Sequence, residues 1–342
     1  MNKIFSKKAR TALASAGTVA MACAAMAACA NAGAETARSG PDNYPNTGRV
    51  SIVVPFAPGG ATDIVARLLA DALGKRWSTA VIVENKPGAG GGIGTEYVAR
   101  AKADGYTLLL GTQTALAVNP VLLPRISYKV DKDFAPITEL AETPLVLLAS
   151  QKTGWNSVGD AVAAIKAKPD GFSYGSSGNG TSQHLTALMM LNRIGGKAVH
   201  VPYKGSSQSL VDLAGNQIDL QFDNMTTALA FAQNGKAKAL AVTSEKRVPQ
   251  SPDLPTVAES GVPGFSAVTW LGLLAPAGTP PQVVKFLNEE VVAVLKTPAF
   301  ANQLQAQGFT PKPMSPQAFG KFIADETVKF TELIKSNHVS IN

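Results

Sequence analysis

The sequence predicts an α/β protein, and two observations support that prediction. Short apolar runs alternate with longer segments in which apolar residues recur at helical spacing, and glycine-rich turns separate the two. This alternation is typical of a parallel sheet covered by helices. The chain has 342 residues, enough for two ordinary domains, and its 45% hydrophobic content against 16% charged content favours a packed core over disorder.

The first group of elements begins with an apolar strand at 52–55. A helix is expected at 62–75, because Ile64, Val65 and Leu68 recur at i, i+3 and i+4 spacing and so share one face. The elements that follow in order are a strand at 80–84, a helix at 94–103 and a strand at 106–110.

A second group of the same kind follows, so we expect two α/β halves. Its elements are a strand at 145–150, a helix at 158–167, a strand at 172–175, a helix at 181–193, a strand at 198–202, a helix at 206–213, and strands at 219–222 and 237–243. After a proline-rich loop at 248–255 come a strand at 268–275 and helices at 281–295, 298–307 and 316–336. The lobes predicted are 49–148 with 246–342, and 149–245.

Residues 1–32 have the pattern of a secretory signal peptide. Four basic and no acidic residues precede an apolar, alanine-rich run, and Ala30-Asn31-Ala32 is a possible cleavage site. We therefore expect a periplasmic protein. The stretch that ends at Cys29 loosely resembles a lipoprotein box, so anchoring through Cys29 stays an alternative. Residues 33–48 read as a flexible lead-in.

The charge and motif content exclude several classes of function. Without the signal segment the chain carries 27 basic and 24 acidic residues, and no basic stripe is interleaved with aromatic residues, so no nucleic-acid partner is expected. Both cysteines lie in the signal segment and no HExxH occurs, which argues against a metal site. The run from Gly88 to Gly94 misses the dinucleotide fingerprint, because Ile93 and Thr95 stand where the third glycine belongs. No cofactor is predicted.

Four turns that follow strands are the candidate binding loops, at 55–63, 111–114, 175–184 and 222–227. In open α/β sheets ligands bind beyond the carboxyl ends of the strands. The first and third loops are rich in glycine and each opens a helix, whose first N–H groups lack partners and favour an anion. Such turns also occur as plain connections, so the loops alone leave both interpretations open.

For individual side chains in these loops, both a functional role and a structural role are possible interpretations. Asp63 could order its loop or accept a hydrogen bond from a ligand, since a carboxylate beside a bound anion would repel it. His184 could act as a general base or as a polar contact, and Asp223 as a base, a metal ligand or a loop-ordering acid. His200 and Trp270 are expected to serve structure and packing.

Taken in order, several motifs resemble the solute-binding proteins of tripartite tricarboxylate transporters, the Bug-type family. They are VPFAPGGATDIVAR, VENKPGAGGGIGTEYVARAKADGYTLLLGT, YGSSGNGTSQHL, VPYKG with FDN, and WLGLLAPAGTP, and they extend over about residues 49–337. The resemblance implies a periplasmic binding protein type II fold, with two α/β lobes, a ligand cleft and a hinge. It implies a receptor without catalysis.

The resemblance also implies the ligand and the partners. The ligand would be a small carboxylate: a di- or tricarboxylate, an acidic amino acid or an aromatic acid. The partner would be a membrane permease of the same transporter type, and the receptor would act as a monomer. Thr186-Ala187-Leu188 and Val118-Asn119-Pro120 depart from the family pattern, which leaves the identity of the ligand open.

The ligand contacts that the resemblance implies come from both lobes. They are Phe56, Ala57, Gly59, Gly60, Thr62 and Asp63 on one side, Ser176, Asn179, Thr181, Ser182, His184 and Asp223 on the other, and Thr112 and Gln113 at the far end of the ligand. Two alternatives are a secreted hydrolase that acts on a carboxylate ester with His184 and Asp223, and a sensory module that shares the fold but signals to another partner.

Overall fold

The computed structural model describes residues 39–123 and 125–340, and these belong to one unit of the fold that begins at Ser39. The signal peptide and Cys29 lie outside the described residues. Within the lead-in, Pro41–Asn43 form a short 3₁₀ turn (η1), and Tyr44 is buried and donates its hydroxyl to Gly105 O at 2.7 Å.

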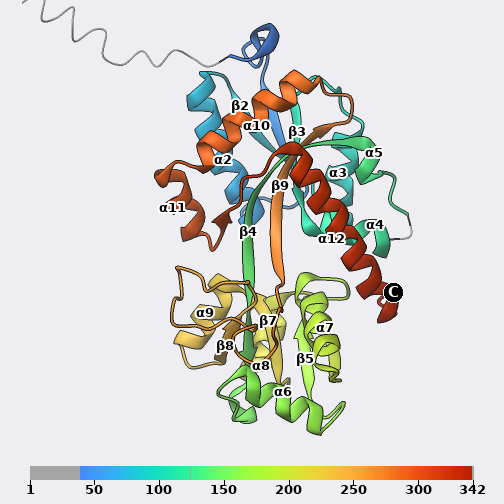
Figure 1. Ribbon diagram of the computed structural model, residues 1–342, viewed down its shortest axis with the longest axis vertical. Helices are drawn as coiled ribbons and strands as arrows, with labels where there is room; N and C mark the ends of the chain where they lie inside the picture. Colours follow the sequence, from blue (N-terminus) through green and yellow to red (C-terminus); the bar gives the residue numbers. More distant parts are fainter. Residues whose placement is uncertain (1–38, 124, 341–342) are drawn as a thin grey trace, which may run out of the picture. The chain divides into compact units, whose positions relative to one another are not determined.

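Three parallel strands form the first part of the sheet (Figure 1). They are β1 (Val50–Val54), β2 (Val81–Asn85) and β3 (Thr107–Thr112), and the helices beside them are α2 (Ala61–Trp77) and α3 (Gly92–Ala99). Every residue of β1 is buried, and Val50, Ile52 and Val54 share a core with Leu69, Leu73 and Trp77 of α2. The predicted strands and the first helix are present, whereas the second helix ends earlier than expected, at Ala99.

Two long antiparallel strands, β4 (Phe134–Ala149) and β9 (Val268–Pro276), continue the sheet. Figure 1 shows them side by side, running from the group around β1 to the group around β7. The strand order is β2-β1-β3-β9-β4-β7-β5-β6, and β8 and β10 also pair with β4. The predicted parallel pairing is present in β1, β2 and β3, whereas β3, β9, β4 and β7 pair in antiparallel fashion, so the sheet as a whole is mixed.

The first half of β4 is missing from the sequence prediction, which began this strand at 145. Glu139 and Glu142 interrupt its apolar pattern, and Pro136 and Pro144 are residues that strands usually avoid. The strand forms because β9 supplies a pairing partner along Phe134–Pro144, with two irregularities in register.

The second group of elements has its own parallel strands. They are β5 (Ser173–Ser176), β6 (Val199–Pro202) and β7 (Leu220–Asn224), with the antiparallel β8 (Lys238–Val242) on β4 and the helices α6 (Val158–Ala167), α7 (Ser182–Ile194), α8 (Ser206–Ala214) and α9 (Met225–Gln233). Helix α9 was not predicted. It starts directly after β7, where a loop was expected at 222–227.

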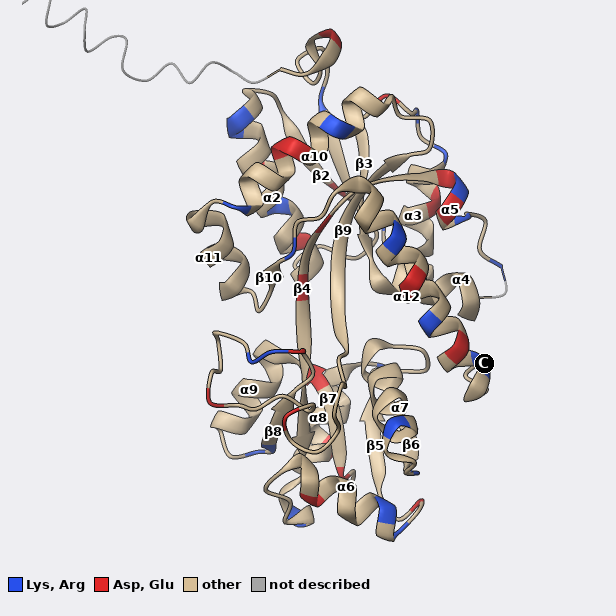
Figure 2. Ribbon diagram, in the orientation of Figure 1, with Lys and Arg blue, Asp and Glu red and all other residues tan. Residues whose placement is uncertain are grey.

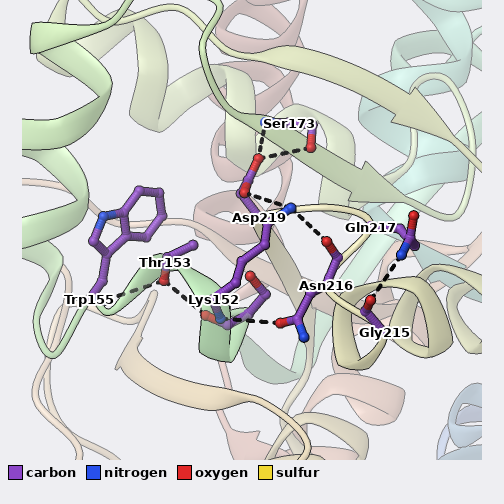
Figure 3. A network of polar contacts seen from close by, with 9 residues as sticks. Lys152, Thr153, Trp155, Ser173, Gly215, Asn216, Gln217 and Asp219 are labelled. Carbon is purple, nitrogen blue, oxygen red and sulfur yellow. Dashed lines mark hydrogen bonds and ion pairs between the residues drawn. The ribbon is translucent and has the colours of Figure 1, made fainter.

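A polar network fixes the amino ends of β5 and β7 (Figure 3). Asp219 Oδ2 accepts from Ser173 N at 2.8 Å and from Ser173 Oγ at 3.0 Å, and Asp219 Oδ1 lies 3.3 Å from Lys152 Nζ. Lys152 also donates through its backbone N and its Nζ to Asn216. This network joins the amino ends of β5 and β7. The candidate binding loops, at 176–184 and 224–227, follow the carboxyl ends of the same two strands.

The carboxyl-terminal helices α10 (Pro281–Leu295), α11 (Pro298–Ala306) and α12 (Pro316–Ser336) match their predicted bounds to within one residue. Val283, Leu287 and Val291 of α10 share a core with β1 and α2. Helix α12 packs through Phe319 and Phe330 in a second core that also contains Leu185 of α7. The carboxyl-terminal helices therefore pack against the first group of strands, and α12 also contacts α7 of the second group.

The segment between β8 and β9 packs on the second group. Val257, Val262 and Phe265 lie in the same core as Tyr174 and Phe222. Shorter elements complete the chain: η2 (Ala89–Gly91), η3 (Thr114–Val118), α4 (Asn119–Leu122), α5 (Val130–Asp133), η4 (Gln151–Thr153) and β10 (Thr310–Pro311).

Candidate functional site

A cavity of about 810 Å³ lies at the carboxyl ends of β1, β3, β5 and β7. Its wall comes from the first loop with α2, η2, the end of β3 with η3 and α4, and the third loop with α7. The start of α9, Thr143 of β4, the start of β9 and the segment after α11 complete it. No Lys, Arg, His, Asp or Glu is found among the described residues that line it. Figure 2 shows many charged residues on the outer helices instead.

Three helix amino termini meet at this cavity. The N-cap residues are Gly60 for α2, Thr181 for α7 and Asn224 for α9, and none of the three forms a side-chain cap hydrogen bond. The first residues of each helix line the cavity: Ala61 and Thr62 in α2, Ser182 and Gln183 in α7, and Met225, Thr226 and Thr227 in α9. Uncapped N–H groups and the helix dipoles make such a cavity favourable for an anion without a basic side chain.

Half of the side chains predicted to contact a ligand lie on the wall of this cavity. They are Phe56, Thr62, Thr112, Gln113, Asn179, Thr181 and Ser182. Ala57, Gly59, Gly60, Asp63, Ser176, His184 and Asp223 are not part of the lining, and the charged or titratable ones among them form hydrogen bonds within the loops. Their contact with a ligand stays a prediction.

Asp63 orders the first loop. Its carboxylate, which is 2% exposed, accepts from Arg67 Nε at 2.9 Å and Nη2 at 3.0 Å, from Gly59 N at 2.9 Å and from Asn85 Nδ2 at 2.8 Å. Asn85 Nδ2 also donates to Phe56 O at 3.1 Å. The hydrogen bond from Arg67 lowers the pKa of Asp63 to about 2. The loop is therefore tied to α2 and β2 by one buried carboxylate.

We expect Asp63→Asn to lower the free energy of unfolding by about 1–3 kcal/mol, because it removes a buried, charge-assisted acceptor of the loop. Since the folded-state pKa is depressed, the contribution of the carboxylate is present above pH 3.8 and is lost as the pH falls through 2. Urea unfolding at pH 7 measures the effect. Asp71→Asn on the same helix is the matched control, because Asp71 is exposed and pairs with Lys75 at the surface. Equal losses in both variants would contradict the role of Asp63.

The third loop rests on two stacked histidines. The rings of His184 and His200 lie 3.8 Å apart, and Tyr174 stacks on His200 at 4.8 Å. His184 Nδ1 accepts from Gly180 N at 3.0 Å, and Ser176 Oγ lies 2.7 Å from His200 Nε2. Burial lowers the pKa of His184 to about 3 and that of His200 to about 4, so both rings stay neutral at pH 7.

Asp223 is fully buried at the end of β7, and its carboxylate accepts hydrogen bonds from neighbouring residues of the protein. It accepts from Ser206 Oγ, from Gln221 Nε2 at 2.5 Å and from Asn224 N at 2.7 Å, and burial raises its pKa. These bonds hold the turn between β7 and α9, next to the cavity wall.

Several lining residues escaped the sequence analysis. Thr143 on β4 and Thr269, Trp270 and Leu271 on β9 come from the two long strands, Asn119 comes from α4, and Gln307 and Phe309 come from the segment after α11. Thr143, Thr269, Trp270 and Leu271 reach the cavity through the pairing of β4 with β9, which no local pattern specifies. Trp270 is 1% exposed and packs against Phe319 and Phe322, in agreement with its expected packing role.

The two lobes, the crossing strands and the cavity between helix amino termini define the fold class of periplasmic solute-binding proteins. Residues 65–339 match the model of the tripartite tricarboxylate transporter family receptor. The chain belongs to this family of receptors. The prediction of a receptor without catalysis is confirmed, and the alternative of a hydrolase that uses His184 and Asp223 is excluded.

Relatives support the same assignment. The chain is 37% identical over 295 residues to Protein BugT of Bordetella pertussis, covering 86% of this chain and 90% of BugT. Among solved structures it is similar to Rpa4515 of R. palustris with adipate (TM-score 0.73, 34% identity, 85% and 98% of the two chains). It is also similar to MatC of Rhodopseudomonas palustris with bound malate (TM-score 0.68, 31% identity, 84% and 98%).

Proposed function

We propose that this chain is a periplasmic receptor that captures one small carboxylate in the cavity and presents it to a permease of the tripartite tricarboxylate type. The observation that carries the proposal is the convergence of three uncapped helix amino termini on a cavity whose described lining bears no charged side chain. The adipate and malate in the two similar structures support a carboxylate as the ligand. Export by the predicted signal peptide and action as a monomer belong to the same proposal.

Closure about β4 and β9 would enclose the ligand. Up to Pro144, β4 pairs with β9, and from Leu145 it pairs with β7, so the partner changes at one point of the strand. We propose the lobe limits at this point: residues 49–144 with 268–340, and residues 145–267. The segment 246–267 thereby moves to the second lobe, where Val257 and Val262 pack. A ligand that contacts both lobes stabilises the closed state over the open state.

The proposal is tested by thermal unfolding of the mature chain with a ligand panel. We expect at least one mono-, di- or tricarboxylate, acidic amino acid or aromatic acid to raise the unfolding temperature, because a ligand at a hundred times its Kd stabilises by about 2.7 kcal/mol. Neutral sugars and alkylamines are the controls. Stabilisation by a sugar or an amine, with none by any carboxylate, would refute the proposal.

A further inference from the structure

Gln113, at the carboxyl end of β3, has an amide of fixed orientation. The residue is 5% exposed and lines the cavity. Its Nε2 donates to Val268 O at 2.8 Å and to Glu326 Oε2 at 3.0 Å, which uses both of its hydrogens. Its Oε1 has no partner among the described residues. The amide cannot turn over, because the flipped oxygen would face a backbone carbonyl and a carboxylate, both of which are acceptors.

Glu326 of α12 supplies the constraint. It is 8% exposed, its Oε2 also accepts from Trp270 Nε1 at 3.1 Å, and its Oε1 accepts from Lys329 Nζ at 2.9 Å. The one polar atom of the Trp270 side chain is thereby engaged behind the cavity wall, although Trp270 lines the cavity. At this part of the wall the Gln113 amide therefore offers its oxygen, an acceptor, beside the hydrocarbon of an indole.

We propose that the group of the ligand that meets Gln113 is a hydrogen-bond donor, so that the receptor selects carboxylates that carry a hydroxyl or amino group. This inference rests on the proposed function. The anionic end of such a ligand is served by the helix amino termini, and its donor is served by Gln113 Oε1. A second carboxylate group of the ligand at Gln113 would place an acceptor against an acceptor. A C–H group at the same place would leave the buried amide oxygen of Gln113 without a hydrogen bond. Gln113 is then a specificity residue and Glu326 a positioning residue.

The test compares ligands that differ only by the donor. The pairs are malate with succinate, 4-hydroxybenzoate with benzoate, and 6-hydroxyhexanoate with hexanoate, each titrated by calorimetry into the mature chain. We expect the hydroxylated member of at least one pair to bind about tenfold more tightly, the size of one well-placed hydrogen bond. If carboxylates bind and no pair shows this preference, the inference fails while the proposed function stands. If no carboxylate binds, the proposed function itself fails.

Two variants assign the preference to its residues. In Gln113→Met, which keeps the length of the side chain without the amide, the ratio of affinities within the pair should fall towards one. In Glu326→Gln the ratio should fall in part, because a neutral amide can donate to Gln113 Oε1, so that only Val268 O still opposes the turned Gln113 amide. A ratio that persists in Gln113→Met would overturn the specificity role, and one that persists only in Glu326→Gln would overturn the positioning role.

The matched control is Glu332→Gln, which removes the same charge from an exposed position of α12. Its ratio should equal that of the parent chain, and a fall in the control would overturn the assignment to Glu326. Circular dichroism and the unfolding temperature of each variant show that the fold persists. Because the readout is a ratio within one variant, a general loss of affinity does not change it.

Discussion

Gly180→Ala should weaken ligand binding by about 10–100-fold while leaving the protein folded. Gly180 lines the cavity, has a φ of +73°, and lies so close to Leu122 that a Cβ would overlap Leu122 Cδ2. An alanine there combines left-handed backbone strain of about 1 kcal/mol with a clash between the third loop and α4. Since the two segments face one cavity from the two lobes, the clash should hold the wall open. Calorimetric titration with the carboxylate found by the ligand panel measures the loss.

Two further variants separate strain from overlap. Gly195, at the other end of α7, has a similar φ of +62°, and a Cβ there meets no atom within 4 Å. Gly195→Ala should therefore cost some stability and leave affinity unchanged. Leu122→Ala in the Gly180→Ala background should recover part of the affinity, because it removes the atom that clashes. The idea is wrong if Gly180→Ala binds normally, or if Gly195→Ala weakens binding as much.

The stability of this protein should contain large dependences on pH of opposite sign, and His184 and Glu139 contribute one of each sign. Burial, and the nearby His200, lower the pKa of His184 from 6.5 to about 3. The contribution of a group with a depressed folded-state pKa of this kind is present above pH 6.5 and is lost as the pH falls, since only the unfolded chain takes up the proton. Between pH 7 and pH 5 this loss amounts to about 2 kcal/mol.

Glu139 on β4 acts in the other direction. The residue is 1% exposed, and its Oε1 has no hydrogen-bond partner among the residues that the structure describes. Burial, with Glu142 and Glu326, raises its pKa from 4.5 to about 8, although Lys312 acts in the other direction. Its contribution is fully present below pH 4.5 and is lost as the pH rises through 8, because the unfolded chain ionises first. Lowering the pH from 7 to 5 should therefore restore about 2–3 kcal/mol.

We expect two variants to expose these opposed effects. His184→Asn, whose side-chain oxygen can still accept from Gly180 N, should favour pH 5 over pH 7 by about 2 kcal/mol relative to the parent chain, and Glu139→Gln should favour pH 7 by a similar amount. Guanidinium unfolding at the two pH values, followed by tryptophan fluorescence, measures both. His338→Asn and Glu332→Gln, at exposed positions, are the controls. A pH difference equal to that of the parent chain in either test variant would contradict the assignment of that residue.

Much of the local structure follows from the sequence. The helix at 158–167 is correct at both ends, and at its amino end Ser157 and Asp160 form a capping box, which depends on neighbouring residues only. Pro281, Pro298 and Pro316 mark the first residues of three helices for the same kind of reason. Helix α9 was not predicted, and it has no proline at its first position and no capping box of this kind.

For the site, the sequence identified the loops around the cavity correctly, but it could not show which of their side chains line the cavity and which form bonds within the protein. Thr62 and Ser182 line the cavity, whereas Asp63 and His184, one and two residues further along, are turned to Arg67 and Gly180. Whether a polar residue of a loop contacts a ligand or its own backbone depends on partners that arrive from elsewhere in the fold, as Asn85 does for Asp63. Trp270 and Gln113 likewise depend on Glu326, more than 50 residues away in the chain.

By itself, the sequence determined the alternation of strands and helices, the glycine turns that leave helix amino termini open, and the family to which the motifs point. Those properties arise from periodicity and backbone chemistry within a few residues. Only the tertiary structure decided that β4 and β9 cross between the lobes in antiparallel fashion, and that Glu326 turns the amide of Gln113 towards its own carboxylate. Both depend on contacts between residues far apart in the chain, which no local pattern specifies.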